Sequence, residues 1–210
     1  MKKIFIISAL LICTGLSAQR ADIRKAAERY KNANTVITNV TQTRHNTAIA
    51  QDIIAQGHFY YKKPNCQSMI FKDVKEMLLA VDNTFVMVKD GKQRTARAKG
   101  KGNNPFEVLQ SVFRNLLSAD DETSLSELAD VKLTKQGDIC TIIITPTVTD
   151  SKVKRRMMFT SCVATIDLKV AELHRLRINE QGGNYTQYDF SNYLFNAEVS
   201  DNVFDVNAVQ

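Results

Sequence analysis

The sequence predicts a mainly β fold, with about ten or eleven antiparallel strands and two or three helices. The first indication is that apolar residues recur at every second position between residues 57 and 90, the period at which side chains alternate between the two faces of a sheet. The second is that turn-forming residues interrupt the pattern at short intervals, here and again between residues 131 and 191. Antiparallel strands in such number need a barrel or a sandwich.

The first 18 residues have the features of a cleavable secretory signal. Two lysines precede an apolar run over residues 4–12, which is too short to span a bilayer, and small residues ending at Ala18 offer a cleavage site. Cys13 leaves lipid attachment as an alternative, although Ile12 is bulky where a lipoprotein signal has a small residue. We therefore expect residues 1–18 to be removed and residues 19–210 to form a single secreted domain.

Charge and motif content argue against several classes of function. The net charge of +6 falls to +4 without the two lysines of the leader, well below the excess of a typical nucleic-acid binder. The three histidines lie far apart, and the chain has no H-E-x-x-H pair, no G-x-S-x-G elbow, no phosphate loop and no dinucleotide fingerprint. We therefore expect a soluble protein that is not an enzyme and has no metal, no cofactor and no nucleic-acid partner.

The mature chain is predicted to begin with a helix and a hairpin. Residues 22–33 place apolar side chains on one face at helical spacing, and Asp22 can serve as the N-cap. Residues 36–44 and 49–61 then alternate as two strands, which are expected to pair through the turn at residues 45–48.

Residues 57–90 are predicted to form a meander of three or four strands, with breaks at residues 62–65, near Asp73 and at residues 82–83. The set of positions opposite the alternating apolar residues is also largely apolar, so either both faces are covered or one face receives an apolar ligand. Core packing is the simpler interpretation and ligand lining the alternative. The candidate lining residues are Phe59, Tyr61, Met69, Phe71, Met77 and Phe85.

The most complete helix signal covers residues 105–118, after a polar, basic strand at residues 92–98. Asn104 is the expected N-cap, Pro105 occupies the first helical position, and Glu107 completes a pattern similar to a capping box. Its apolar stripe packs on the sheet either as plain core or as the cover of a ligand cavity. The residues of the stripe are Phe106, Leu109, Phe113, Leu116 and Leu117.

The remainder of the chain is predicted to be strands again. They are expected at residues 131–135, 139–146, 154–167, 172–179 and 185–191. Phe204 and Val206 are expected in a short edge strand. The basic cluster at residues 154–156 either protects a sheet edge or attracts an anionic lipid or an acidic partner.

Cys140 and Cys162 are candidates for a disulfide. In a hairpin that turns near Ser151 the two residues lie opposite each other, and directly opposed residues of an antiparallel pair can bring Cβ atoms within disulfide range. Two buried thiols in a shifted register are the alternative, and Cys66 stays free in either case.

Several short motifs occur in a distinctive order along nearly all of the mature chain. They are Val40–Gln42, Gly57–Tyr60, Lys63–Asn65, Leu79–Asp82, Gly102–Phe106 and Asn196–Phe204. Together with the order of the helices and strands, they make the chain resemble the periplasmic outer-membrane lipoprotein carrier (LolA-like) family.

This resemblance implies an incomplete, strongly curved antiparallel β-barrel with helices closing the open side. The space between sheet and helices would hold acyl chains, and Phe106, Leu109, Phe113 and Leu117 would line it together with the meander residues. In the family a basic residue, usually Arg, stands immediately before the corner proline and acts in release or handover. Lys63 holds that place here, and a lysine does not reproduce the planar fork of an arginine.

The resemblance also implies the function. It implies a monomeric periplasmic carrier that takes acylated lipoproteins from an inner-membrane exporter and gives them to an outer-membrane acceptor. Exposing one acyl chain of about 15 carbons to water costs on the order of 12 kcal/mol, at about 0.8 kcal/mol per CH₂, so such cargo needs an apolar shelter. The alternative is a lipid- or glycolipid-binding or sensing module of the same fold with no role in delivery.

Overall fold

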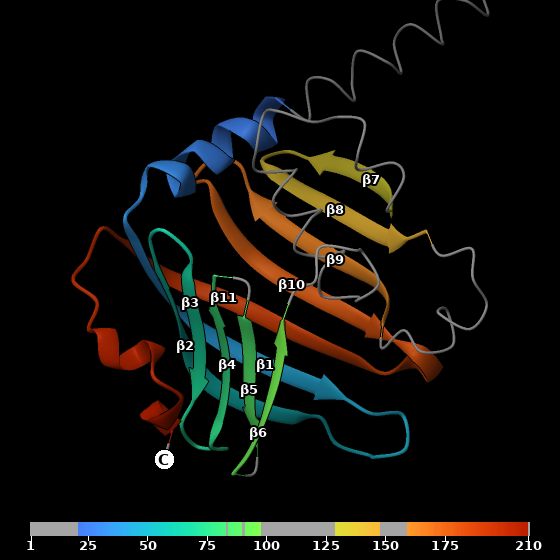
Figure 1. Ribbon diagram of the computed structural model, residues 1–210. Helices are drawn as coiled ribbons and strands as arrows, with labels where there is room; N and C mark the ends of the chain where they lie inside the picture. Colours follow the sequence, from blue (N-terminus) through green and yellow to red (C-terminus); the bar gives the residue numbers. More distant parts are fainter. Residues whose placement is uncertain (1–20, 83, 90, 98–128, 148–158, 210) are drawn as a thin grey trace, which may run out of the picture.

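The computed structural model describes residues 21–82, 84–89, 91–97, 129–147 and 159–209. Within these ranges the chain forms one 11-stranded antiparallel sheet in the order β6-β5-β4-β3-β2-β1-β11-β10-β9-β8-β7 (Figure 1). The sheet is not closed, because β6 and β7 end it on opposite sides. The predicted mainly β class and strand number are therefore confirmed, while the predicted second helix, residues 105–118, lies outside the described residues.

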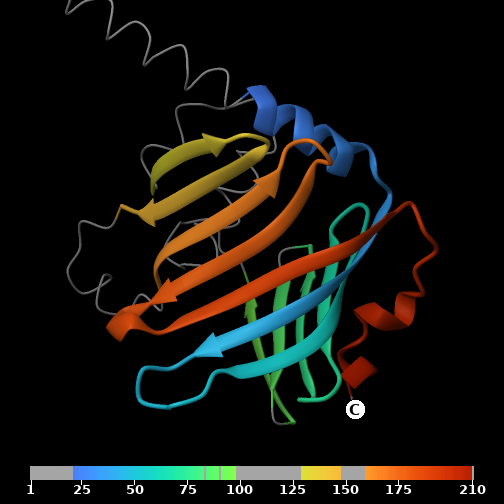
Figure 2. The same cartoon turned by 180° about the vertical axis from the view of Figure 1, so that it is seen from behind.

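The strands of the two halves of the chain meet where β1 pairs with β11 (Figures 1 and 2). The first half contains β1 (Thr35–His45), β2 (Ile53–Lys62), β3 (Cys66–Phe71), β4 (Glu76–Val81), β5 (Thr84–Lys89) and β6 (Lys92–Arg97). The second half contains β7 (Ala129–Gln136), β8 (Ile139–Pro146), β9 (Phe159–Asp167), β10 (Glu172–Glu180) and β11 (Tyr185–Phe195). The short 3₁₀ helix η1 (Gln181–Gly183) connects β10 to β11, and η2 (Asp201–Phe204) and η3 (Val206–Val209) follow β11.

The sheet curls strongly toward one face, here called the inner face. Strands β3 and β11 are three steps apart, which in a flat sheet means about 14 Å at the usual strand spacing. The rings of Phe71 on β3 and Tyr188 on β11 nevertheless have centroids only 6.5 Å apart. Val40 and Ala55, on the strands between them, belong to the same buried cluster. The inner face is therefore concave and carries its own core.

The N-terminal helix, residues 21–32, covers one end of this inner face. Its Ile23 belongs to the buried cluster that contains Ile142 and Ala164 of β8 and β9. The ring of Tyr30 packs edge-on against Phe195 of β11, at a centroid distance of 5.4 Å. This confirms the helix predicted at residues 22–33. Among the described residues, no helix is both long and apolar enough to cross a bilayer.

The outer face of β3–β5 is covered by the end of the chain. Val203, Phe204 and Val206 pack against a buried cluster formed by Ile70, Met77, Leu79 and Val88. The edge strand predicted around Phe204 is wrong, because this segment forms η2 and η3 and binds the sheet through its side chains rather than its backbone. The outer face of the meander is therefore apolar because the C-terminal segment packs on it.

The disulfide predicted between Cys140 and Cys162 is also wrong. In the observed register Cys140 lies opposite Ile166, and Cys162 lies opposite Ile144. The two cysteines are thus four positions out of register, or about 13 Å along the strand, far beyond disulfide range. Both thiols are free and buried, and burial raises the pKa of Cys162 to about 12.

Candidate functional site

A continuous band of half-buried apolar side chains crosses the inner face of β2–β5. The strand registers place it side by side: Phe59 lies opposite Met69, Met69 opposite Leu78, and Leu78 opposite Met87. We call this band the inner apolar surface. It consists of Phe59, Tyr61, Met69, Leu78, Ala80, Phe85 and Met87. Apolar side chains that remain partly accessible on a concave face can hold an apolar ligand.

The structure brings four of the predicted lining residues together on this surface. Phe59, Tyr61, Met69 and Phe85 all point to the inner face and are half-buried. Phe71 lies on the same face, but it is fully buried and its ring packs near that of Tyr188 on β11. Phe71 is therefore core beneath the surface.

The prediction that Met77 lines the same surface is wrong. Met77 lies opposite Ile70, points to the outer face and is fully buried under the C-terminal 3₁₀ helices. The cause is the four-residue connection 72–75, after which Phe71 pairs with Glu76. The inner face therefore changes from odd-numbered positions on β3 to even-numbered positions on β4.

Sequence reasoning missed three lining residues. Leu78 and Ala80 were missed for the same reason, because they occupy the even positions of β4. Met87 of β5, opposite Leu78, was also missed, although it shares the inner face with Phe85. The signal that could have found Leu78 and Ala80 is Glu76: a charged residue at the start of β4 marks a change in the apolar alternation.

The predicted handover residue, Lys63, lies at the corner between β2 and β3, before a cis proline. Its side chain is exposed, and its backbone N–H donates to the carbonyl of Asn34 at 2.9 Å. Other predicted site residues lie outside the described residues: Phe106, Leu109, Phe113, Leu117 and the basic cluster at 154–156.

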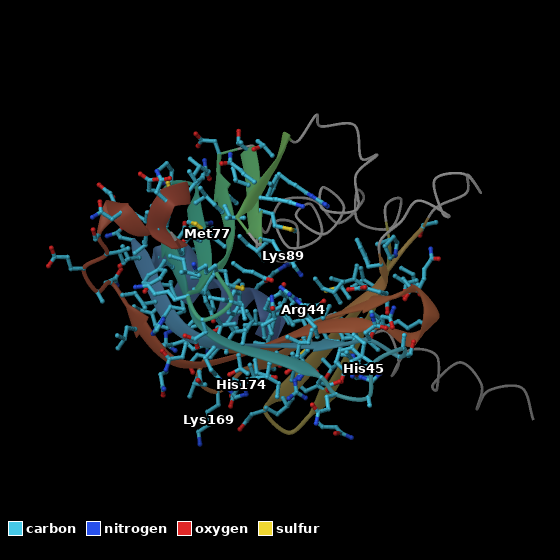
Figure 3. The ribbon with its side chains drawn as sticks, turned by 90° about the horizontal axis from the view of Figure 1, so that it is seen from below. Arg44, His45, Met77, Lys89, Lys169 and His174 are labelled. Carbon is cyan, nitrogen blue, oxygen red and sulfur yellow. The ribbon has the colours of Figure 1, made fainter. Side chains whose placement is uncertain are left out.

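An ion-pair network centred on the buried Glu76 stands beside the inner apolar surface, and Figure 3 labels its two cations, Arg44 and Lys89. Glu76 of β4 is only 7% exposed. Arg44 of β1 holds it with both ends of the guanidinium, Nη1 donating to Oε1 at 2.8 Å and Nη2 to the other oxygen. Lys89 of β5 approaches the same carboxylate at 3.4 Å. One carboxylate thus joins three strands, of which β1 is distant in sequence from the other two. The sequence offered no signal for this network.

The network keeps Glu76 ionised. Burial alone favours the neutral acid, but the hydrogen bonds and charges of Arg44 and Lys89 outweigh it and hold the pKa of Glu76 below its ordinary value. A bidentate guanidinium is the strongest neutral-pH partner for a carboxylate, because it supplies two parallel charged hydrogen bonds.

Within the part of the chain that the structure describes, no three His, Cys, Asp or Glu side chains gather in a way that could hold a metal ion. The described inner face instead offers an apolar surface with charged groups on one flank. An apolar surface with charged groups beside it can bind an amphiphile.

Comparison with solved structures finds similar chains at low identity. A DUF1329 family protein from Desulfovibrio piger is 14% identical, with a TM-score of 0.46, over 90% of this chain and 98% of the other. Mycobacterium tuberculosis lipoprotein LppX is 17% identical, with a TM-score of 0.42, over 88% and 98%. A putative outer membrane lipoprotein-sorting protein domain from Vibrio parahaemolyticus is 12% identical, with a TM-score of 0.42, over 89% and 97%.

A comparison with curated protein sequences gave no match. Residues 31–207 match the model of the family described as outer membrane lipoprotein carrier protein LolA. The match begins within the N-terminal helix and ends within η3, so it includes all eleven described strands and the inner apolar surface. The chain therefore belongs to the LolA family of outer membrane lipoprotein carrier proteins.

Proposed function

We propose that this protein is a periplasmic lipoprotein carrier. It shelters the acyl chains of lipoproteins on the inner apolar surface and moves them from the inner to the outer membrane. Membership of the LolA family supports this proposal, and the observation that carries it is the concave, half-buried apolar band across β2–β5. In this proposal residues 1–18 are a cleaved signal peptide, and residues 19–210 act as a monomer between an exporter and an acceptor.

The inner apolar surface has the properties that a reversible carrier needs. It is apolar enough to replace water around an acyl chain, at about 0.8 kcal/mol for each buried CH₂. Met69 and Met87 adapt to irregular apolar shapes because their side chains are unbranched and polarisable. The helix expected at residues 105–118 belongs to the proposal as a cover, with Phe106, Leu109, Phe113 and Leu117 toward the ligand. Lys63 belongs to it as the handover residue.

Copurified cargo tests the binding step. The full chain is expressed with its leader in a bacterium that makes lipoproteins, purified without detergent and analysed by mass spectrometry. Diacylated or triacylated polypeptide is the expected result. Free lipid alone would favour the alternative of a lipid-binding module without delivery, and an empty protein would contradict the proposal.

A matched pair of leucine variants ties that binding to the inner apolar surface. Leu78→Gln places an amide on the inner face, whereas Leu194→Gln changes a leucine that is 56% exposed and points to the outer face. Leu78→Gln is expected to reduce bound cargo at least tenfold, and Leu194→Gln to leave it unchanged. Equal cargo on both variants would exclude the inner apolar surface.

Delivery is tested separately in cells. After depletion of the protein, lipoproteins destined for the outer membrane are expected to accumulate in the inner-membrane fraction. Complementation with Leu194→Gln should restore the distribution, and Leu78→Gln should not. An unchanged distribution after depletion would contradict a carrier role while leaving lipid binding intact.

A further inference from the structure

Beside the inner apolar surface, at the β5–β6 end of the described sheet, lies a hollow of about 350 Å³. Its described lining consists of Met87, Lys89, Lys92 and Arg94. The hairpin register explains this lining, since Met87 lies opposite Arg94 and Lys89 opposite Lys92. All four side chains therefore leave the sheet on its inner face. The volume is near the lower end of the roughly 300–1,000 Å³ of small-molecule sites.

Met87 connects the hollow to the inner apolar surface. It lies opposite Leu78 on one side and Arg94 on the other. An elongated ligand that lies on the inner apolar surface can thus reach the hollow without leaving the inner face.

The charge of the hollow is positive and incompletely neutralised. Within strands β1–β6, the inner face carries four cations, Arg44, Lys89, Lys92 and Arg94, and one carboxylate, Glu76. Glu76 is already engaged by Arg44 and by Lys89. Lys92 and Arg94 have no ion-pair partner among the described residues. Since the local balance is three positive charges in excess, the matching ligand group is an anion.

We propose that this hollow binds the anionic head group, a phosphate or a carboxylate, of an amphiphile whose chain lies on the inner apolar surface. Lys92 and Arg94 contact the head group, and Arg94 supplies the planar fork suited to two oxygens. Lys89 adds a third cation from the Glu76 network. The inference rests on the proposed function for the placement of the chain, and it adds a selectivity for charge that apolar burial alone does not provide.

Two probes with the same chain isolate the head group. Dodecyl phosphate and dodecyl maltoside, both below their micelle concentrations, are titrated into the full mature chain by calorimetry. The wild type is expected to bind the phosphate at least tenfold more tightly than the maltoside, and this ratio should shrink as salt is raised because exposed charges are screened. Equal affinities at low salt would overturn the inference and leave the proposed function standing.

A charge-matched pair of double variants assigns the preference to the hollow. Lys92→Gln with Arg94→Gln is expected to remove the preference while retaining affinity for the maltoside. Lys132→Gln with Lys169→Gln removes the same charge from exposed positions on β7 and on the β9–β10 connection, and should retain the preference. Thermal unfolding of both double variants verifies their folding. A preference that survives loss of Lys92 and Arg94 would overturn the inference.

Inorganic phosphate shows whether the hollow binds a free anion or only a head group attached to an apolar chain. It also distinguishes failure of the anion-site inference from failure of the carrier proposal. Competition by inorganic phosphate at constant ionic strength would show that a free anion suffices, whereas its failure to compete would show that the head group binds only when tethered by its chain. Both results support an anion site. A third outcome is that the wild type binds inorganic phosphate, the Lys92/Arg94 variant does not, and neither dodecyl probe binds. This outcome would retain the anion site and contradict the carrier proposal. Binding of no probe would overturn both.

Discussion

Gly57 shows how a single residue allows the sheet to curl. It lies on the inner face of β2, opposite Val40 of β1. A Cβ atom added there would lie 2.2 Å from the backbone oxygen of Ile70 and 2.6 Å from the ring of Phe71. Because no side chain occupies this position, Phe71 can lie across β2 and reach Tyr188. The concave core thus depends on having a glycine, which has no Cβ atom, at position 57 of β2.

Replacing Gly57 by alanine should therefore destabilise the protein. The close neighbour is a backbone oxygen, which cannot rotate away, so we expect a loss of about 1–3 kcal/mol, as for other overpacked cores. Denaturant unfolding at neutral pH measures it. The control is Gln56→Ala, an exposed neighbour on the outer face, which should stay within about 0.5 kcal/mol of the wild type. Equal stability of Gly57→Ala and the wild type would show that the sheet has room to relax.

Glu76 provides a prediction with a defined pH dependence. Because its pKa is lowered in the folded state, ionised Glu76 contributes stability above its unfolded pKa of about 4.5, and this contribution is lost as the pH falls through the lower folded value. Glu76→Gln should be less stable at pH 7 by about 1.5–3 kcal/mol, the range for hydrogen bonds to charged groups. The difference should shrink below pH 4.5. A difference that is the same at pH 7 and pH 3.5 would contradict the ion-pair network.

At the scale of the elements, local patterns predict where strands occur better than how they face. The strand at residues 139–146 and the helix at 22–33 were predicted closely, because alternation and helical spacing are local properties. Which side chains of β4 point to the inner face was not predicted, because this depends on the length of the connection 72–75 and on how β3 pairs with β4. The Cys140–Cys162 register failed for a similar reason: a shift of a few residues in one turn displaces every partner.

The C-terminal segment illustrates an element defined by packing alone. The sequence around Val203 and Phe204 has no regular apolar alternation, yet these two residues cover the outer face of β3–β5. Phe204→Ala should therefore lower stability by about 1–3 kcal/mol, less than a fully buried phenylalanine because Phe204 is half-buried. Thermal unfolding measures it, with the exposed Glu198→Ala as control. Dodecyl phosphate affinity should not change, since the segment lies on the face opposite the inner apolar surface; a matching loss of affinity would contradict this separation.

At the scale of the whole molecule, curvature creates the candidate site. Arg44 and Glu76 stand on strands three steps apart, and only a curled sheet lets them meet. The sequence could indicate apolar strands and four of the lining residues, since each is a local feature. It could not indicate the Arg44–Glu76–Lys89 network or the hollow at β5–β6, because these depend on the pairing of β1 with β2, β2 with β3 and so on across the sheet.

A surface kept partly accessible for a ligand should gain stability when the ligand arrives. A ligand that binds only the folded state adds about 2.7 kcal/mol at one hundred times its Kd. For a chain of this length that corresponds to a rise in Tm of about 5–10 °C. We expect dodecyl phosphate to produce this rise in the wild type and in Leu194→Gln, but much less in Leu78→Gln. Calorimetric scans below the micelle concentration provide the measurement. If Leu78→Gln showed the full rise, the ligand would be stabilising some other part of the molecule, and the half-buried band across β2–β5 would be ordinary core.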